Sequence, residues 1–120
     1  MRRAVTDDVR RALDEQRTVE ITTTGRRTGR PRRLETWRYR AAGRYWLTGS
    51  PGPRDWYANV LAHPSFTLHL NSLALQVRGR AVLDPEERER VLGEIVPAVD
   101  WAGSLEGWIA GSPLVEIEFD

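Results

Sequence analysis

The sequence predicts an α+β fold in which antiparallel strands form a meander or a small barrel, with short helices inserted between them. Several short runs alternate in polarity, contain β-branched or aromatic residues, and are separated by turn-forming segments. Segments with helix-capping residues interrupt these runs, but strands and helices do not alternate regularly, and no GxGxxG motif supports a Rossmann fold. The 120 residues are predicted to form a single domain, 1–120.

In the first half of the chain we expect one helix followed by three strands. Thr6 is a candidate N-cap, with Asp7 and Asp8 in the first turn of a helix that ends near Gln16. Three alternating runs rich in β-branched or aromatic residues follow and predict strands over 19–24, 34–40 and 45–48.

The second half begins with a loop at 49–53, because this segment contains two glycines and two prolines. Asp55 is the candidate N-cap of a short helix over 55–62. The later predicted elements are two strands, a helix opened by a capping box at Asp84-Pro85-Glu86-Glu87, and a last strand: 66–70, 75–82, 84–96 and 113–119. Residues 97–112 contain two tryptophans among small residues and allow no assignment.

Charge is distributed unevenly along the chain. Residues 1–60 contain 14 arginines and 7 acidic residues, whereas residues 61–120 contain 4 arginines and 10 acidic residues. The first half therefore carries a net charge of +7 and the second half −6, so an anionic ligand is expected to bind in the first half. Every basic residue is arginine, a bias that high-GC coding also produces.

Composition also limits the cellular compartment. Cysteine is absent, which excludes disulfides and thiolate chemistry and fits a cytoplasmic location. Apolar runs are short, and none follows Met1-Arg2-Arg3, so neither a transmembrane segment nor a signal peptide is expected. Membrane association is the alternative to a purely cytoplasmic protein.

Few side chains suggest metal binding or acid–base catalysis. The histidines, His63 and His69, lie in no metal-ligand motif, so no metal site is expected; His63 is expected to cap a helix end and His69 to lie on a strand face. No serine has a nucleophile-elbow context, and Glu86 and Glu87 are assigned to the capping box. No catalytic side chain is therefore predicted.

The segment 22–33 contains the most informative pattern. Around two glycines and a proline, directly after a predicted strand, it places Arg26, Arg27, Arg30, Arg32 and Arg33. A guanidinium matches phosphate and carboxylate oxygens two at a time, and glycine permits a tight turn or a close approach to a ligand. An anion clamp is the favoured interpretation, and a solvated turn of an arginine-rich chain is the alternative.

On the helix predicted over 55–62, Trp56 and Asn59 share one face. Trp56 could hold a planar ligand by ring contact and Asn59 by hydrogen bonds, near a helix N-terminus whose free N–H groups favour anions. Equally, Trp56 and Val60 could be core residues and Asn59 a surface residue.

Two motifs in order along the chain, TTTGRRTGRPRR and DWYANVLAHP, resemble the deazaflavin-dependent nitroreductase and quinone reductase family. That family carries a TTGRxSGxPR-like segment followed by a WYxNLxxNP-like segment. The resemblance covers residues 19–82. It implies a split β-barrel of the FMN-binding, flavin-reductase type, and binding of coenzyme F-420, a deazaflavin with a phosphate and an acidic oligoglutamate tail.

Carried over motif by motif, the resemblance also implies site residues. The phosphate and tail would be bound by Arg26, Arg27 and Arg32, and the ring would be held from the helix by Trp56 and Asn59. The residues implied to line the ring are Thr48, Gly49, Ser50 and Pro51. Trp37 takes the place of a tyrosine often found on the substrate side. The glycine loop lacks the family's usual lysine, and the C-terminal segment carries tryptophans instead of tyrosines.

The implied function is that of an oxidoreductase, in which reduced coenzyme F-420 transfers a hydride to a quinone, a nitroaromatic or a similar planar electrophile. The alternative is a non-catalytic protein that binds a flavin, a deazaflavin or an apolar ligand, with FMN as the alternative cofactor. Nucleic-acid binding is not expected, because the acidic second half argues against a broad basic face. A homodimer remains open.

Overall fold

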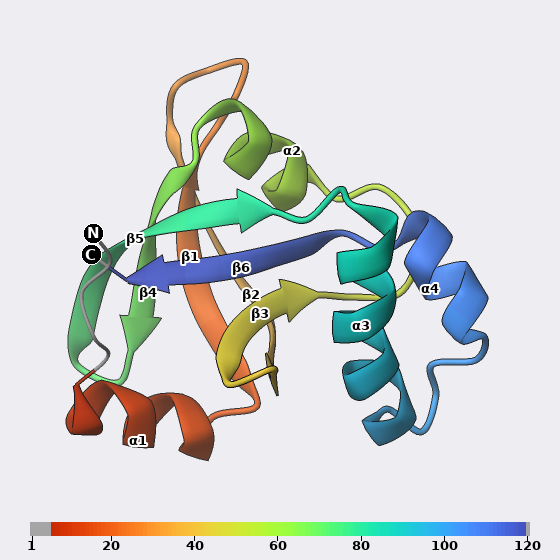
Figure 1. The fold of residues 1–120 in the computed structure, drawn as a ribbon. Helices are drawn as coiled ribbons and strands as arrows, with labels where there is room; N and C mark the ends of the chain where they lie inside the picture. The colour runs from red at the N-terminus through yellow and green to blue at the C-terminus, as the bar shows by residue number, and fades with distance from the viewer. Residues whose placement is uncertain (1–5, 120) are drawn as a thin grey trace.

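The computed structural model describes residues 6–119, within which the chain forms six strands, four α-helices and one short 3-10 helix (Figure 1). Their order is α1 (Asp7–Glu15), β1 (Thr18–Thr24), β2 (Pro31–Ala41), β3 (Arg44–Thr48), α2 (Asp55–Ala62), β4 (Ser65–Leu70), β5 (Leu73–Ala81), α3 (Pro85–Ile95), η1 (Val96–Ala98), α4 (Leu105–Gly111) and β6 (Leu114–Phe119). The expectation that no signal peptide is present rests on Met1 to Arg3, which lie outside the described residues.

The six strands form a closed antiparallel barrel in the order β1-β2-β3-β6-β5-β4. Closure pairs the first strand with the fourth and the third with the last, so every strand has two neighbours and the sheet has no free edge. The α+β class is confirmed, and of the two arrangements expected from the sequence the barrel is the correct one.

The barrel interior is filled by alternate residues of its strands. On β1 the buried positions are Val19, Ile21 and Thr23, while Glu20 faces outward and is exposed. Helices α1 and α2 lie at opposite ends of the barrel, and their apolar residues Leu13 and Val60 belong to the same core (Figure 1). The end near α2 is the one at which the turn between β1 and β2 projects.

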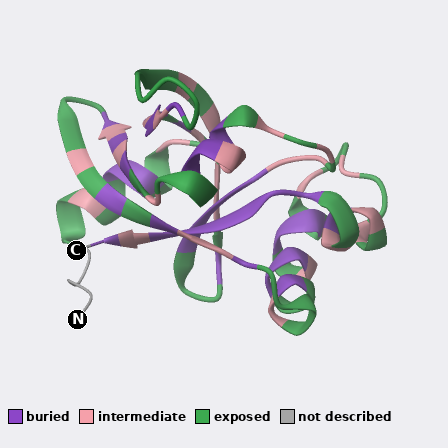
Figure 2. Cartoon of the chain, turned by 90° about the horizontal axis from the view of Figure 1, so that it is seen from above, coloured by how far each residue is buried: buried purple, intermediate pink, exposed green. Residues whose placement is uncertain are grey.

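A second core lies outside the barrel, where α3 and α4 pack against residues of β2, β3 and β6. Trp46 and Trp108 are fully buried there, together with the apolar face of α3. Figure 2 shows this division, with buried positions along the strands and on one side of the helices and exposed positions on the outer sides.

Helix capping matches the sequence at two of three predicted sites. Thr6 accepts a hydrogen bond from the backbone N–H of Val9, and Asp84 accepts one from that of Glu87. The capping box is only half correct, since the Glu87 carboxylate binds Arg80 instead of returning to the cap. Asp55 is not an N-cap: it is the first residue of α2.

Two strands start more than one residue earlier than the sequence predicts, and one unassigned region contains a helix. Strand β2 begins at Pro31, so Arg32 and Arg33 lie on a strand and the intervening turn is only 25–30. Strand β5 begins at Leu73, because pairing with β4 extends to the turn at 71–72. The unassigned region 97–112 contains part of η1 and all of α4, whose N-cap Ser104 accepts a hydrogen bond from Gly107.

Candidate functional site

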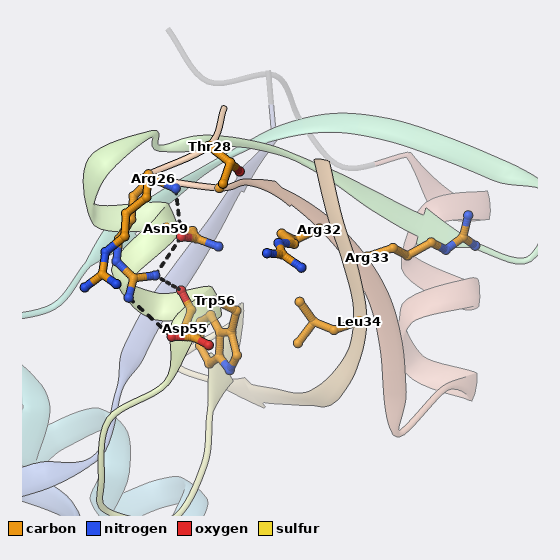
Figure 3. A pocket seen from close by; sticks show the side chains of 10 residues that line it. Arg26, Thr28, Arg32, Arg33, Leu34, Asp55, Trp56 and Asn59 are labelled. Carbon is orange, nitrogen blue, oxygen red and sulfur yellow. Dashed lines mark hydrogen bonds and ion pairs between the residues drawn. The ribbon is translucent and has the colours of Figure 1, made fainter. Parts of the chain in front are cut away.

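A pocket of about 460 Å³ opens between the turn that follows β1, the start of β2 and the first turns of α2 (Figure 3). Its lining residues are Gly25, Arg26, Arg27, Thr28, Arg32, Arg33, Leu34, Asp55, Trp56 and Asn59. The predicted cofactor residues among them are Arg26, Arg27, Arg32, Trp56 and Asn59. The fold thus brings the arginine motif and the tryptophan motif to one end of the barrel.

The turn over 25–30 owes its shape to its glycines. Gly25 donates its N–H to the Arg30 carbonyl at 2.8 Å, and Gly29 donates to the Gly25 carbonyl at 2.8 Å. A Cβ at position 25 would lie 2.7 Å from the Thr28 hydroxyl oxygen, and Gly29 has a φ of +70°, so side chains are disfavoured at both positions. The turn therefore closes on itself through its own backbone.

Strand register decides which arginines of β2 face the pocket. Arg32 lies opposite Thr23 in the β1–β2 pair, so it shares the inner face of the barrel wall. Arg33 lies on the other face and points away from the pocket (Figure 3), where its guanidinium donates to the Glu20 carboxylate at 2.8 Å. That hydrogen bond and the positive charge of Arg33 hold the pKa of Glu20 below its usual value.

Asn59 joins the arginine turn to α2. Its side-chain oxygen accepts hydrogen bonds from the Arg26 backbone N–H at 3.1 Å and from the Arg26 guanidinium at 2.9 Å. Its amide nitrogen donates to the Thr23 hydroxyl at 3.2 Å. Only 4% of Asn59 is exposed, so the alternative of a surface asparagine is wrong.

Arg27 and Arg32 differ from Arg26 and Arg33, the other two arginines that line the pocket. Among residues 6–119, Arg26 is bound by Asp55 and Asn59 and Arg33 by Glu20, whereas the guanidinium groups of Arg27 and Arg32 make no hydrogen bond or ion pair. Both line the pocket, which leaves two cationic groups beside an open volume.

The pocket also has an apolar wall. Trp56 is buried, packs with the barrel core and meets Tyr57 edge to face, yet one side of its ring lines the pocket. Leu34 points toward it from β2 (Figure 3). Trp56 is thus a core residue, as one of the two alternatives had it, and it also lines the pocket, while its contact with a ligand stays a prediction.

The residues 48–51 lie outside the lining of this pocket. Thr48 is buried, and its hydroxyl donates to the Pro113 carbonyl. The Arg54 guanidinium donates to the Ser50 carbonyl at 2.9 Å, and the Gly52 N–H donates to the Gly111 carbonyl at 3.1 Å. The glycine loop is therefore held by Arg54 and by α4.

Trp37 also lies apart from the pocket. It is directly opposite Thr18, on the outer face of β2, and 44% of its surface is exposed. Because neighbouring strand positions alternate, it faces away from Arg32 and Leu34. The structure thus does not bring Trp37 together with the arginines.

The histidines have the positions expected of them. His63 is the C-cap residue of α2, and its backbone N–H donates to the Asn59 carbonyl at 2.8 Å. His69 lies on β4 with its Nε2 2.7 Å from the Thr22 hydroxyl. Within residues 6–119, no three His, Cys, Asp or Glu side chains form a metal-binding group, and no helix is long and apolar enough to cross a membrane.

Asp55 and Leu34 are among the residues that line the candidate pocket but were not predicted from the sequence. Asp55 was expected to cap α2, but as the first helical residue it reaches the Arg26 guanidinium at 3.3 Å. Leu34 follows Arg32 by two positions, so a strand begun at Pro31 predicts both on one face. Had the sequence analysis started β2 at Pro31, the alternation of strand positions would have predicted that Leu34 faces the pocket with Arg32.

Comparison with known proteins gives a consistent result. The sequence model of the F420H(2)-dependent quinone reductase family matches residues 1–101. The fold is similar to that of an F420-H2 dependent reductase, with a TM-score of 0.61 and 23% identity over 86% of this chain and 95% of that one. No curated protein matches the chain.

Two further solved structures are similar in fold. One, described as a domain-swapped dimer, has a TM-score of 0.60 and 26% identity over 86% of this chain and 81% of that one. A FAD-binding protein from Mesorhizobium loti has a TM-score of 0.65 and 12% identity over 98% and 92% of the two chains. The predicted split barrel of the flavin-reductase type is confirmed.

Proposed function

Because the chain belongs to the F420H(2)-dependent quinone reductase family, we propose that it reduces a small planar acceptor, a quinone or a nitroaromatic, with coenzyme F-420 bound at the arginine pocket. When bound, the reduced deazaflavin supplies a hydride. The side chains of this protein bind and orient the cofactor.

The chemistry of the pocket fits the cofactor. The anionic phosphate and tail of coenzyme F-420 need cations. Arg27 and Arg32 offer two guanidinium groups with no partner inside the described chain. The planar ring of the cofactor needs an apolar surface, which Trp56 and Leu34 offer. The pairing of unengaged arginines with a tryptophan wall is the observation that carries the proposal.

The roles of the other predicted residues remain predictions. Thr48, Gly49, Ser50 and Pro51 precede α2 in the chain, and we propose that this segment borders the ring beyond the arginine pocket. Trp37 remains a prediction for the acceptor side.

No side chain of the pocket is needed as a general base. Asp55 is the acidic residue among those that line it, and its carboxylate is 91% exposed and paired with Arg26. Reduction of the acceptor takes up a hydride and a proton, and solvent can supply the proton at this open pocket, so the side chains need only hold the two molecules close and in the right orientation.

Titration of the purified protein with oxidised coenzyme F-420 and, in parallel, with FMN tests the cofactor assignment by fluorescence. We expect saturable binding of the deazaflavin and weaker binding of FMN, which lacks the long acidic tail. Turnover is then measured with the reduced cofactor and menadione or a nitroaromatic acceptor. Tight binding without turnover on either acceptor class would favour the non-catalytic binding protein over the reductase.

We also propose a homodimer, since one similar structure is described as a domain-swapped dimer. Light scattering at several protein concentrations tests it, and a constant monomer mass would exclude it. Organisation as a single domain and a cytoplasmic location also remain predictions.

A further inference from the structure

We propose that Arg26 is a positioning residue whose guanidinium does not bind the ligand: with Asn59 and Asp55 it fixes the 25–30 turn to α2 and so sets where Arg27 points. This assignment differs from the one that the family resemblance implies for Arg26 and Asn59. The effect of this positioning on cofactor binding rests on the proposed function. The contact of Arg26 with Asn59 and Asp55 is present without a cofactor.

The side-chain oxygen of Asn59 has no free lone pair to offer a ligand. An amide oxygen has two lone pairs, and both are used here, by the backbone and the guanidinium of Arg26. The amide nitrogen is directed to Thr23 on β1. The side chain is almost fully buried, so a ligand could reach its oxygen only by displacing Arg26.

The second argument is the surroundings of Arg26 itself. Beyond Asn59, its guanidinium meets the Asp55 carboxylate at 3.3 Å and the Asp55 carbonyl at 3.5 Å. A guanidinium paired with a carboxylate is partly neutralised by it, and one bonded to an amide oxygen as well has fewer free N–H groups to offer an anion. Its neighbour Arg27 has no such partner in the described chain, although both line the same pocket.

The third argument concerns how the turn is attached. The hydrogen bonds of Gly25 and Gly29 close the turn on itself and do not reach α2. Across the described part of the chain, the hydrogen bonds that join this turn to α2 all come from Arg26. Three of the four come from the guanidinium, so without that group the turn would be joined to α2 only by the Arg26 backbone N–H, and the position of Arg27 would be less defined.

Hydrogen exchange on the ligand-free protein tests the attachment without any cofactor. Arg26→Ala and Arg26→Lys are compared with Arg27→Ala, the matched change at the next position. We expect both Arg26 variants to exchange the turn amides about tenfold faster than wild type, because the planar fork is lost in each, whereas Arg27→Ala leaves the exchange unchanged. Unchanged exchange in the Arg26 variants would overturn the proposal.

Cofactor titration over a range of ionic strength supplies the second readout. A residue that contacts the anion contributes to the salt dependence of the affinity, so Arg27→Ala should flatten it, whereas Arg26→Lys should lower the affinity and keep the wild-type salt dependence. If Arg26→Lys instead retains wild-type affinity while Arg26→Ala flattens the salt profile, Arg26 binds the anion directly. If wild type binds no deazaflavin, the proposed function fails, and the exchange experiment still decides the attachment.

Discussion

Arginines have opposite surroundings at the two ends of this molecule. On α3, Arg88 is only 9% exposed and donates to the carbonyls of Val82, Trp108, Ile109 and Ser112. In the pocket beside α2, Arg27 and Arg32 line an open volume and have no partner among the described residues. The number of arginines therefore does not indicate where an anion binds. The hydrogen bonds and ion pairs of each arginine distinguish a structural cation from one that is available to a ligand.

Arg88 explains how the short helix α4 ends. Three of its four acceptors, the carbonyls of Trp108, Ile109 and Ser112, lie at the C-terminal end of α4, where the helix has no basic residue of its own. Carbonyls at a helix C-terminus lack intrahelical partners and carry partial negative charge, which a guanidinium satisfies. Arg88 therefore holds α4 against α3 and the end of β5.

The largest effect is expected from Arg88→Met. The change leaves several buried carbonyls without a donor, so the free energy of unfolding should fall by about 3–5 kcal/mol. Denaturant unfolding measures it, with Arg90→Met, an exposed arginine of the same helix, as the control, expected within about 0.5 kcal/mol of wild type. Equal losses in the two variants would show that Arg88 is not the structural cation described above.

A smaller effect is expected from Glu87→Gln, which removes one carboxylate partner of Arg80, another arginine held by side chains of the protein. The guanidinium of Arg80 binds Glu87 at 3.0 and 2.6 Å and the buried Glu116 at 2.9 Å. The hydrogen bonds from Arg80 to Glu87 hold the pKa of Glu87 below its ordinary 4.5. A carboxylate with a lowered pKa stabilises the fold above its unfolded pKa, and this stabilisation is lost as the pH falls through the lowered value.

Unfolding of wild type and Glu87→Gln is therefore compared between pH 7 and pH 3. We expect the variant to be less stable by about 0.5–1 kcal/mol at pH 7, because the pair is partly exposed, and the difference to shrink below pH 4.5. A difference that stays constant with pH would mean that the ion pair does not contribute.

The smallest effect is expected from Trp37→Ala. This side chain lies on the outer face of β2, so its removal should change the free energy of unfolding by less than about 0.5 kcal/mol and leave deazaflavin affinity unchanged. An altered KM for the acceptor alone would agree with the predicted substrate-side role. A tenfold loss of cofactor affinity would contradict the conclusion that Trp37 lies outside the cofactor pocket.

Much of the barrel could be predicted from local pattern. Strand alternation is a local property, so β1, β3 and β4 were found within one residue of their observed limits. Barrel closure is not local: it pairs β3 with β6, whose partners Trp46 and Glu116 are far apart in the chain. Helix α4 was missed because its apolar residues sit among small ones, and Arg88, which holds its end, comes from α3.

For the site, the sequence indicated the right segments but not the state of each side chain. Arg26 and Arg27 are neighbours with identical side chains, and what distinguishes them is a contact with Asn59, 33 positions further along. The start of β2 was equally hidden, because Pro31 and the arginines after it suggested a loop. Pairing with β1 overrides that local signal and turns Arg32 inward and Arg33 outward.

Arg27 and Arg32, the unengaged arginines of the pocket, are proposed to bind the anionic part of the cofactor. Fluorescence titration with coenzyme F-420 of Arg27→Ala and Arg32→Ala, against Arg30→Ala as the control from the same turn, tests it most directly. We expect each pocket variant to lose about 1.5–3 kcal/mol of binding free energy, the usual contribution of a hydrogen bond to a charged group, and Arg30→Ala to bind as wild type does. Equal affinities for all three variants and wild type would contradict the claim.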